Sequence, residues 1–300
     1  MKTEFKAMNS TVLLEGIEPI FQMEVKRWLY EFEQKVSRFI ENNPLSFINK
    51  SPLDVPVYLD ETLADLLERS LKLSRKAGYY VHPFVGEAMK SIGYTSSFHD
   101  NYQPVFKEGN HGEKIFLKEP IDRLSKRWLI KKQDFSFDFG GFGKGYIVDQ
   151  TKKQLLLRKG HRFLVNAGGD LAVAGTHQVG IEHPILIGKD MMRLTITDCA
   201  LATSGKNHRR WMKDEAEFHH ILNGRTGKPA SNGVLQASVI AKTTMEAETA
   251  AKILCILPFD QAKALLYKNF RNIAYIVYFD DDQLVLGGDD RLYESLKVSI

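Results

Sequence analysis

The sequence predicts an α+β fold in which a single domain spans residues 1–300. Apolar residues recur at helical spacing in some segments and form short strand-like runs in others, but the two do not alternate as regular β–α–β units. No internal repeat, low-complexity stretch or Pro/Ser-rich linker divides the chain. With 43% hydrophobic and 26% charged residues, the composition is that of a globular protein and excludes disorder, collagen and coiled coil.

The first half of the chain is predicted to be mainly helical. A short strand is expected over residues 10–15, and short strand-like pieces between residues 105 and 130. The pair Asn43–Pro44 should end the first helix. Helices are expected over residues 20–42, 60–76 and 85–92.

The second half begins at the densest glycine cluster of the chain, residues 136–149. A second glycine turn is expected at 167–170. Strands are expected over 161–166, 171–174, in alternation between 181 and 204, and over 273–278 as the closing strand. Helices are expected over 146–158, 245–257 and 261–267.

Charge and cysteine content narrow the classes of function only slightly. The net charge of +4, from 41 basic and 37 acidic residues, suits an acidic small ligand as well as a weak nucleic-acid contact. The two cysteines, Cys199 and Cys255, exclude a disulfide framework and a Cys-rich metal site. Residues 1–8 hold no apolar core, and no window approaches the roughly 18 apolar residues of a membrane span. We therefore expect no signal peptide, lipoprotein anchor or membrane span, and a cytoplasmic protein.

The glycine cluster is the first candidate for a binding site. Residues 138–145 contain four glycines and Lys144, immediately before a predicted helix. Glycines allow close approach of a ligand, the helix start offers N–H groups to an anion, and a lysine adds a point charge for phosphate. The segment fits neither the Rossmann fingerprint nor the P-loop. A plain strand-to-helix connection therefore stays open beside phosphate binding.

Three further features carry both a structural and a functional interpretation. The glycine pair in Asn166–Asp170 usually makes only a turn. His219 and His220 should point to opposite faces of an extended segment, so at most one faces a given site. Glu248 and Lys252 share one face of a predicted helix that is otherwise apolar all round. A surface salt bridge is the simple interpretation, but a charge on a buried helix needs a partner or a function.

Taken together and in order, these segments resemble the ApbE family, the Mg-dependent FAD:protein FMN transferases, over nearly the whole chain. Each piece is short, and their common order carries the resemblance. The pieces are residues 7–11, 36–39 with 45–49, 80–86, 137–149, 163–170, 202–205, 220–229 and the helix around Glu248.

The resemblance implies mixed sheets and packed helices around a flavin-binding cleft, and we expect the glycine segments around Gly141 and Gly168 to line it. It implies that the protein binds FAD and Mg²⁺ and transfers FMN through a phosphoester to a Thr or Ser of a target protein, releasing AMP. His220 is the expected catalytic residue. The expected cofactor-binding residues are Met8, Asn49, Tyr80, Val81, His82, Asp138, Lys144, Ser204 and Ile221.

The metal positions implied by the resemblance are the Gly141 carbonyl, Glu248 and Lys252. Family members usually carry Asp at the position of Glu248 and Thr at the position of Lys252. A lysine ammonium cannot ligate a cation. Two more aspartates are replaced, at His82 and in the His220–Gly227 motif, where Asn223–Gly224 replaces Asp-Pro. Asn9 stands where glycine is usual. We therefore expect the ammonium of Lys252 to occupy the place of magnesium in a metal-free site.

Three functions follow from the resemblance and its departures. The leading one is an FMN transferase acting on FAD and an acceptor protein, with no nucleic-acid or membrane partner. The second is a flavin- or nucleotide-binding relative with a degenerate metal site and no transferase activity. The third is an FAD pyrophosphatase, which hydrolyses FAD to FMN and AMP.

Overall fold

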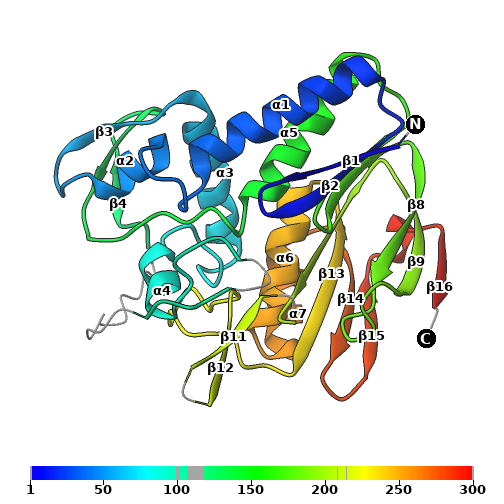
Figure 1. Cartoon of the computed structure of the whole chain (residues 1–300). Helices are drawn as coiled ribbons and strands as arrows, with labels where there is room; N and C mark the ends of the chain where they lie inside the picture. Colours follow the sequence, from blue (N-terminus) through cyan, green and yellow to red (C-terminus); the bar gives the residue numbers. More distant parts are fainter. Residues whose placement is uncertain (1, 99–101, 107–117, 208, 214, 299–300) are drawn as a thin grey trace.

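A long antiparallel sheet forms the centre of the protein, with helices on one face and a smaller sheet over part of the other (Figure 1). The computed structural model describes residues 2–98, 102–106, 118–207, 209–213 and 215–298. Helices and strands are interspersed along the chain without regular β–α–β units. The predicted α+β class and its single domain are confirmed.

Eight strands form the central sheet, and every neighbouring pair is antiparallel. Successive side chains of a strand point to opposite faces, so Val239 and Ile240 pack into separate hydrophobic cores. In spatial order the strands are β1 (Lys2–Ala7), β2 (Ser10–Glu15), β6 (Phe163–Ala167), β7 (Asp170–Ala174), β10 (Ala200–Gly205), β13 (Val234–Ala241), β14 (Ala274–Phe279) and β15 (Leu284–Gly288).

The helices form a layer in which α5 and α6 lie directly against the sheet and α1 packs over α5 (Figure 1). Helix α6 is almost entirely buried because it sits on β10 and β13 with α5 and α7 beside it. The helices are α1 (Pro19–Val36), α2 (Pro44–Lys50), α3 (Glu61–Lys76), α4 (Gly86–Ser91), α5 (Gly143–Leu157), α6 (Thr244–Ile256) and α7 (Phe259–Asn269).

The remaining strands make three smaller units. The sheet β16-β9-β8 covers the face of the central sheet opposite the helices, a second small sheet has the order β3-β5-β4, and β11 with β12 forms a hairpin. Among the residues described, no helix combines the length and the apolar character that crossing a membrane requires. The strands are β3 (Pro56–Tyr58), β4 (Ile121–Arg123), β5 (Trp128–Lys131), β8 (Thr176–Glu182), β9 (Asp190–Thr197), β11 (Arg210–Lys213), β12 (Ala216–His219) and β16 (Ser295–Val298), with a 3-10 turn at Asp290–Leu292.

The first helix ends earlier than predicted. Helix α1 stops at Val36, although the apolar spacing continues to Phe39. The ring of Phe39 packs instead against Tyr94, with 5.4 Å between the ring centroids. Asn43 does not end this helix but begins α2, because its side chain accepts the backbone N–H of Ser46 and Pro44 occupies the first turn. The residues between the two helices are therefore free to line a cleft.

Strand β13 is the largest element absent from the predicted set. Two polar residues, Gln236 and Ser238, interrupt its apolar pattern, and both are buried. The Gln236 amide donates to the Glu182 carbonyl at 2.8 Å, and the Ser238 hydroxyl bonds Thr203 Oγ1 at 2.8 Å. Buried polar groups are tolerated when they find such partners. Helix α2 and strands β1, β3, β11, β12, β15 and β16 were also not predicted. Most of β8 lies before the predicted strand region 181–204, and β14 is not the closing strand.

The other predicted elements lie within a few residues of their observed positions. Helix α5 starts three residues before the predicted 146, inside the glycine cluster. Strands β4 and β5 account for part of the strand-like region between 105 and 130. Residues 107–117 of that region lie outside the described residues.

Candidate functional site

A cleft of about 380 Å³ opens where the end of α1, the glycine segment and α6 come together. Its walls combine apolar and aromatic side chains with four cations and two carboxylates. The charged residues are Arg38, Lys144, Arg209, Lys252, Glu33 and Asp138. A mostly apolar pocket with a few convergent polar groups is the usual form of a small-molecule site.

Ten of the candidate site residues line this one cleft, although they come from five separate segments of the chain. They are Met8, Tyr80, Val81, His82, Asp138, Gly141, Lys144, His220, Ile221 and Lys252. Gly168 does not line it, and that expectation was wrong. Its N–H donates to the Thr11 carbonyl at 3.1 Å in the β6–β7 turn, where its φ of 65° suits glycine.

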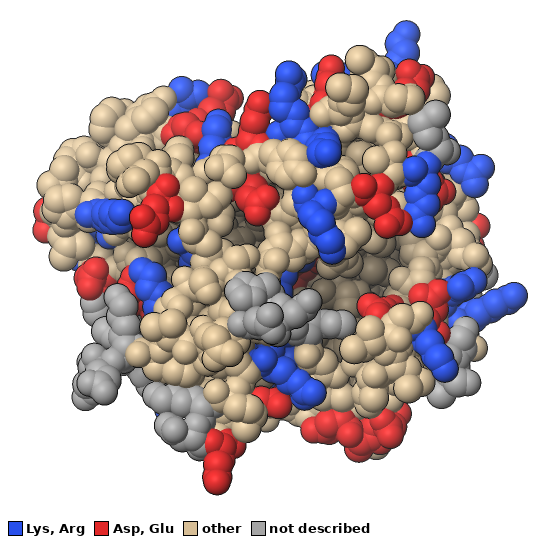
Figure 2. Space-filling view, in the orientation of Figure 1, with Lys and Arg blue, Asp and Glu red and all other residues tan. Residues whose placement is uncertain are grey.

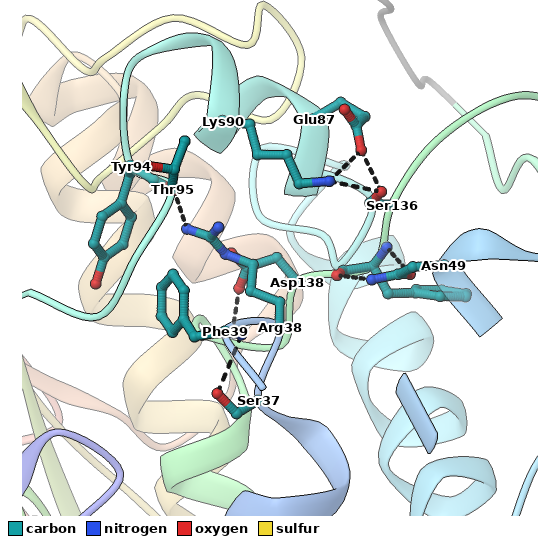
Figure 3. Close-up of polar contacts among 12 residues, drawn as sticks. Ser37, Arg38, Phe39, Asn49, Glu87, Lys90, Tyr94, Thr95, Ser136 and Asp138 are labelled. Atoms are coloured by element: carbon teal, nitrogen blue, oxygen red, sulfur yellow. Dashed lines mark hydrogen bonds and ion pairs between the residues drawn. The ribbon is translucent and has the colours of Figure 1, made fainter. Parts of the chain in front are cut away.

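Asn49 and Ser204, both expected to bind the cofactor, do not line the cleft. The Asn49 side chain accepts the Phe137 N–H at 2.7 Å and donates to the Phe137 carbonyl at 3.1 Å, so it holds the backbone that leads into the glycine segment (Figure 3). Ser204 is buried in β10, and its carbonyl accepts the Cys255 thiol at 3.4 Å. Asn49 therefore fixes the segment that leads into the glycine cluster, and Ser204 lies in a strand that packs against α6.

Arg38 and Asp138 form a buried ion pair in the wall of the cleft (Figure 3). Arg38 Nε donates to Asp138 Oδ2 at 2.6 Å, and Nη2 donates to the Tyr94 carbonyl at 2.6 Å. The other carboxylate oxygen, Oδ1, accepts the Gly140 N–H at 2.6 Å. Asp138 therefore fixes the glycine segment and the guanidinium together.

Glu248 and Lys252 form an ion pair that runs from the buried helix face into the cleft. Lys252 Nζ lies 3.0 Å from Glu248 Oε1, and Glu248 Oε2 accepts the Gly145 N–H at 3.1 Å. The Glu248 side chain is 0% exposed and that of Lys252 is 16% exposed. A Cβ on Gly145 would lie 2.8 Å from Glu248 Oε2, so glycine is needed for α5 to approach α6. The interpretation as a surface salt bridge is wrong.

A second ion pair joins Lys144 at the start of α5 to Asp170 at the start of β7. Asp170 is 1% exposed, and burial raises the pKa of its carboxyl to about 6, although the Lys144 ammonium acts in the opposite direction. Its Oδ2 accepts from Lys144, and its Oδ1 is buried without a hydrogen-bond partner among the described residues. The glycine turn before Asp170 thus places the Asp170 carboxylate beside Lys144.

His219 and His220 point to opposite sides, as predicted. His220 lines the cleft, whereas His219 lines a separate hollow and bonds the Ala230 carbonyl at 2.9 Å. His220 Nδ1 lies 3.4 Å from the Arg209 carbonyl, which can only accept, so Nε2 carries the lone pair. Burial lowers the pKa of His220 well below 6.5, with the Arg209 charge acting in the same direction. The ring is therefore a neutral base at pH 7.

His82 and Gly224, two departures from the family pattern, contact each other. His82 Nδ1 accepts the Phe84 N–H at 3.1 Å, so its Nε2 carries the proton and donates to the Gly224 carbonyl at 2.8 Å. A Cβ on Gly224 would lie 2.8 Å from His82 Cδ2. The histidine and the glycine therefore fit each other. Asn223 keeps the turn of this motif, since its Oδ1 accepts the Arg225 N–H at 3.0 Å.

We expect the free energy of unfolding to depend less on pH, between pH 7 and pH 4, in His82→Gln than in the parent. Burial lowers the pKa of His82 from 6.5 to about 4, so the unfolded chain binds more protons than the native protein between these pH values. The parent should therefore lose stability as the pH falls through this window, by about 3 kcal/mol from this group alone. Glutamine does not titrate, and urea unfolding at pH 7 and pH 4 measures the difference. The exposed His161, changed to Gln, is the control; equal slopes for the parent and His82→Gln would contradict the prediction.

Two cationic residues of the cleft were not among the predicted site residues. Arg38 lies in the segment 36–39, which the resemblance covers without assigning a role to the arginine. Arg209 reaches the cleft because the β11–β12 hairpin pairs Arg210 with His219, which sets Arg209 opposite His220. A hairpin prediction over residues 210–219 would have found it.

The residues at the implied metal positions do not fit a magnesium ion. Magnesium takes oxygen ligands in an octahedral shell. Here both oxygens of Glu248 are engaged by Lys252 and the Gly145 N–H, and an ammonium at 252 donates rather than ligates. In the part of the chain that is described, no group of three or more His, Cys, Asp or Glu residues is arranged to hold a metal.

Comparisons with known proteins find flavin transferases among the relatives of this chain. The model of the ApbE family matches residues 1–277. The chain is 25% identical to the FAD:protein FMN transferase of Treponema pallidum (strain Nichols), over 87% of this chain and 77% of the relative. It is 26% identical to the protein of the same name from Chlamydia pneumoniae, over 83% of this chain and 80% of that relative.

Solved structures show the same fold. The ApbE protein of Thermotoga maritima MSB8 superposes with a TM-score of 0.80 at 20% identity, covering 98% of this chain and 99% of that protein. The flavin transferase ApbE from Vibrio cholerae superposes with a TM-score of 0.77 at 18% identity, covering 97% of each chain.

Proposed function

Because the chain belongs to the ApbE family, we propose that it is an FAD:protein FMN transferase, which moves FMN from FAD to a Thr or Ser hydroxyl of an acceptor protein. The observation that carries the proposal is the gathering of Lys144, Arg209, Lys252 and His220 in one largely apolar cleft. FAD needs such a combination, because its ring systems are aromatic and its diphosphate is anionic.

The charge of the cleft supports a small anionic ligand rather than a nucleic acid. Four cations gather inside the cleft against two carboxylates. On the outer surface, Lys and Arg are interspersed with Asp and Glu over the face shown in Figure 2, without a continuous basic patch on that face. A nucleic-acid site requires such a patch because phosphate contacts dominate the affinity.

The proposed transfer makes one P–O bond and breaks another. The acceptor hydroxyl oxygen attacks the phosphorus of the FMN half of FAD. The bond from this phosphorus to the bridging oxygen breaks, and AMP leaves with that oxygen and its electron pair. Negative charge accumulates on the oxygens during this step, so fixed cations in the cleft lower the barrier.

His220 is suited to accept the proton of the attacking hydroxyl. It lines the cleft, its Nε2 holds the lone pair, and its lowered pKa keeps it neutral at pH 7. Lys144 at the start of α5 is placed to meet a phosphate, and Asp170 behind it fixes the direction of the ammonium.

A second candidate function is flavin binding without transfer. The misfit of the magnesium position favours it, because a divalent cation at the diphosphate supplies more charge than an ammonium does. This candidate shares the cleft and the expected ligand with the transferase and differs only in the chemical step.

Incubation of the protein with FAD and the acceptor protein of a flavin transferase tests both candidates, with and without Mg²⁺. Mass spectrometry should show the acceptor increased by one FMN, and chromatography should show AMP in equal amount. Bound FAD that stays intact would favour the second candidate. Free FMN with AMP would instead indicate an FAD pyrophosphatase.

A further inference from the structure

Four charged side chains meet at the junction of α5, β7 and α6. Two are carboxylates, Asp170 and Glu248, which are 1% and 0% exposed. Two are ammonium groups, Lys144 and Lys252, whose side chains are 19% and 16% exposed and which both line the cleft. The positive ends of both ion pairs therefore face the ligand space, and the negative ends lie behind them in the core.

The aliphatic part of Lys252 runs along the glycine segment. A Cβ on Gly141 would lie 3.4 Å from Lys252 Cε and 3.6 Å from Cδ. The ammonium is thus carried past the backbone at 141 and held at 3.0 Å by Glu248 Oε1, one helical turn away on α6. Its position is defined by two rigid neighbours, a helix and a packed loop.

Glu248 contacts both Lys252 and the backbone of α5. Its second oxygen accepts the Gly145 N–H at 3.1 Å, which ties α5 to α6. A buried carboxylate needs both kinds of partner, because an isolated charge in the core is strongly unfavourable. With both oxygens engaged, Glu248 orients Lys252.

We propose that the Lys252 ammonium, oriented by Glu248, is a built-in cation for the FAD diphosphate, so that FAD binds without a divalent metal. This inference rests on the proposed function, since it names the group that meets the ligand of that site. Lys252 and Lys144 approach the diphosphate from α6 and α5, and the nearer positive charge outweighs the more distant carboxylate behind it.

The consequence is that FAD binding does not depend on a divalent metal. A divalent cation supplies two charges where an ammonium supplies one. An ammonium fixed in place also costs no reorganisation when the ligand arrives. FAD affinity is therefore expected to be insensitive to chelation of Mg²⁺, and sensitive to loss of the charge at 252.

The test is the affinity for FAD, measured by quenching of flavin fluorescence in Mg²⁺ and in EDTA. For the parent, the two affinities should agree within about twofold. Lys252→Met keeps the aliphatic stem and removes the charge, and should weaken FAD binding about 10-fold in both buffers, equivalent to about 1.4 kcal/mol. In Glu248→Asp with Lys252→Thr, which restores oxygen ligands, EDTA should weaken binding at least about 10-fold and Mg²⁺ should restore it.

A matched control separates charge from packing. Lys206 is also buried, lies outside the cleft and donates to the Asn232 carbonyl and Oδ1, both at 2.6 Å. Lys206→Met should keep the parent affinity, and thermal unfolding identifies any variant that fails to fold. The comparison of FAD affinity in Mg²⁺ and in EDTA for the parent protein tests the inference even if a variant fails to fold.

The outcomes distinguish the inference from the proposed function. FAD binding by the parent that falls 10-fold or more in EDTA would overturn the inference and leave the proposed function standing. Unchanged affinity in Lys252→Met would also overturn it. No FAD binding by the parent in either buffer would overturn the proposed function together with the inference that rests on it.

Discussion

His220→Asn should lower the rate of FMN transfer at least about 100-fold while FAD affinity stays within about twofold of the parent. A general base contributes to the transition state, where the acceptor hydroxyl loses its proton, and little to binding of FAD. Asparagine can still donate to the Arg209 carbonyl through Nδ2, as the histidine does through Nδ1, so the local fold should be kept. Single-turnover transfer to an acceptor protein and fluorescence quenching by FAD measure the two quantities.

The neighbouring histidine supplies the control for this experiment. His219→Gln preserves the donor to the Ala230 carbonyl and lies in a different hollow. It should retain the parent transfer rate. If both variants lost activity equally, the effect would be structural. If His220→Asn transferred FMN at the parent rate, the role of His220 as base would be wrong.

The sequence predicts the elements of this fold best where the apolar pattern is strong and local. Helix α3 shows this, with its N-cap Asp60 and a regular leucine stripe. Strand β13 shows the limit. It is central and buried, and its two polar residues are satisfied by partners on β8 and β10 that sequence alone cannot locate. The end of α1 is set in the same way, because the contact of Phe39 with Tyr94 is tertiary.

The candidate site, like the fold, could be predicted from the sequence only in part. The resemblance assembled ten cleft residues from distant segments, yet it could not tell lining residues from those that hold them. Asn49 matches a family motif, but its amide is engaged with Phe137. Arg38 lies in the segment 36–39, which resembles the family, but its guanidinium reaches Asp138 because α1 ends at Val36. The i,i+4 spacing predicted that Glu248 and Lys252 contact each other. Because α6 is buried, this contact lies inside the protein and not on its surface.

Asp138→Asn should lower the free energy of unfolding by about 3 kcal/mol, because it leaves the Arg38 cation buried without a counter-charge. The two side chains are 6% and 8% exposed, so water cannot replace the lost carboxylate. Stacking of the guanidinium on Phe39 and Tyr94, at 4.2 and 4.9 Å from the ring centroids, offsets part of this loss. Urea unfolding at pH 7 measures the change.

A double-mutant cycle with Arg38→Met identifies the cause of that loss. If the ion pair is responsible, the double variant should be more stable than the sum of the two single losses predicts, by about 1–3 kcal/mol. Additive losses would show that each residue acts through other contacts. The Asp138 variant should also bind FAD more weakly, because Oδ1 no longer holds the Gly140 N–H as a charged acceptor and the glycine segment is less fixed. A loss below about 1 kcal/mol, with unchanged FAD affinity, would refute the view that this pair organises the cleft.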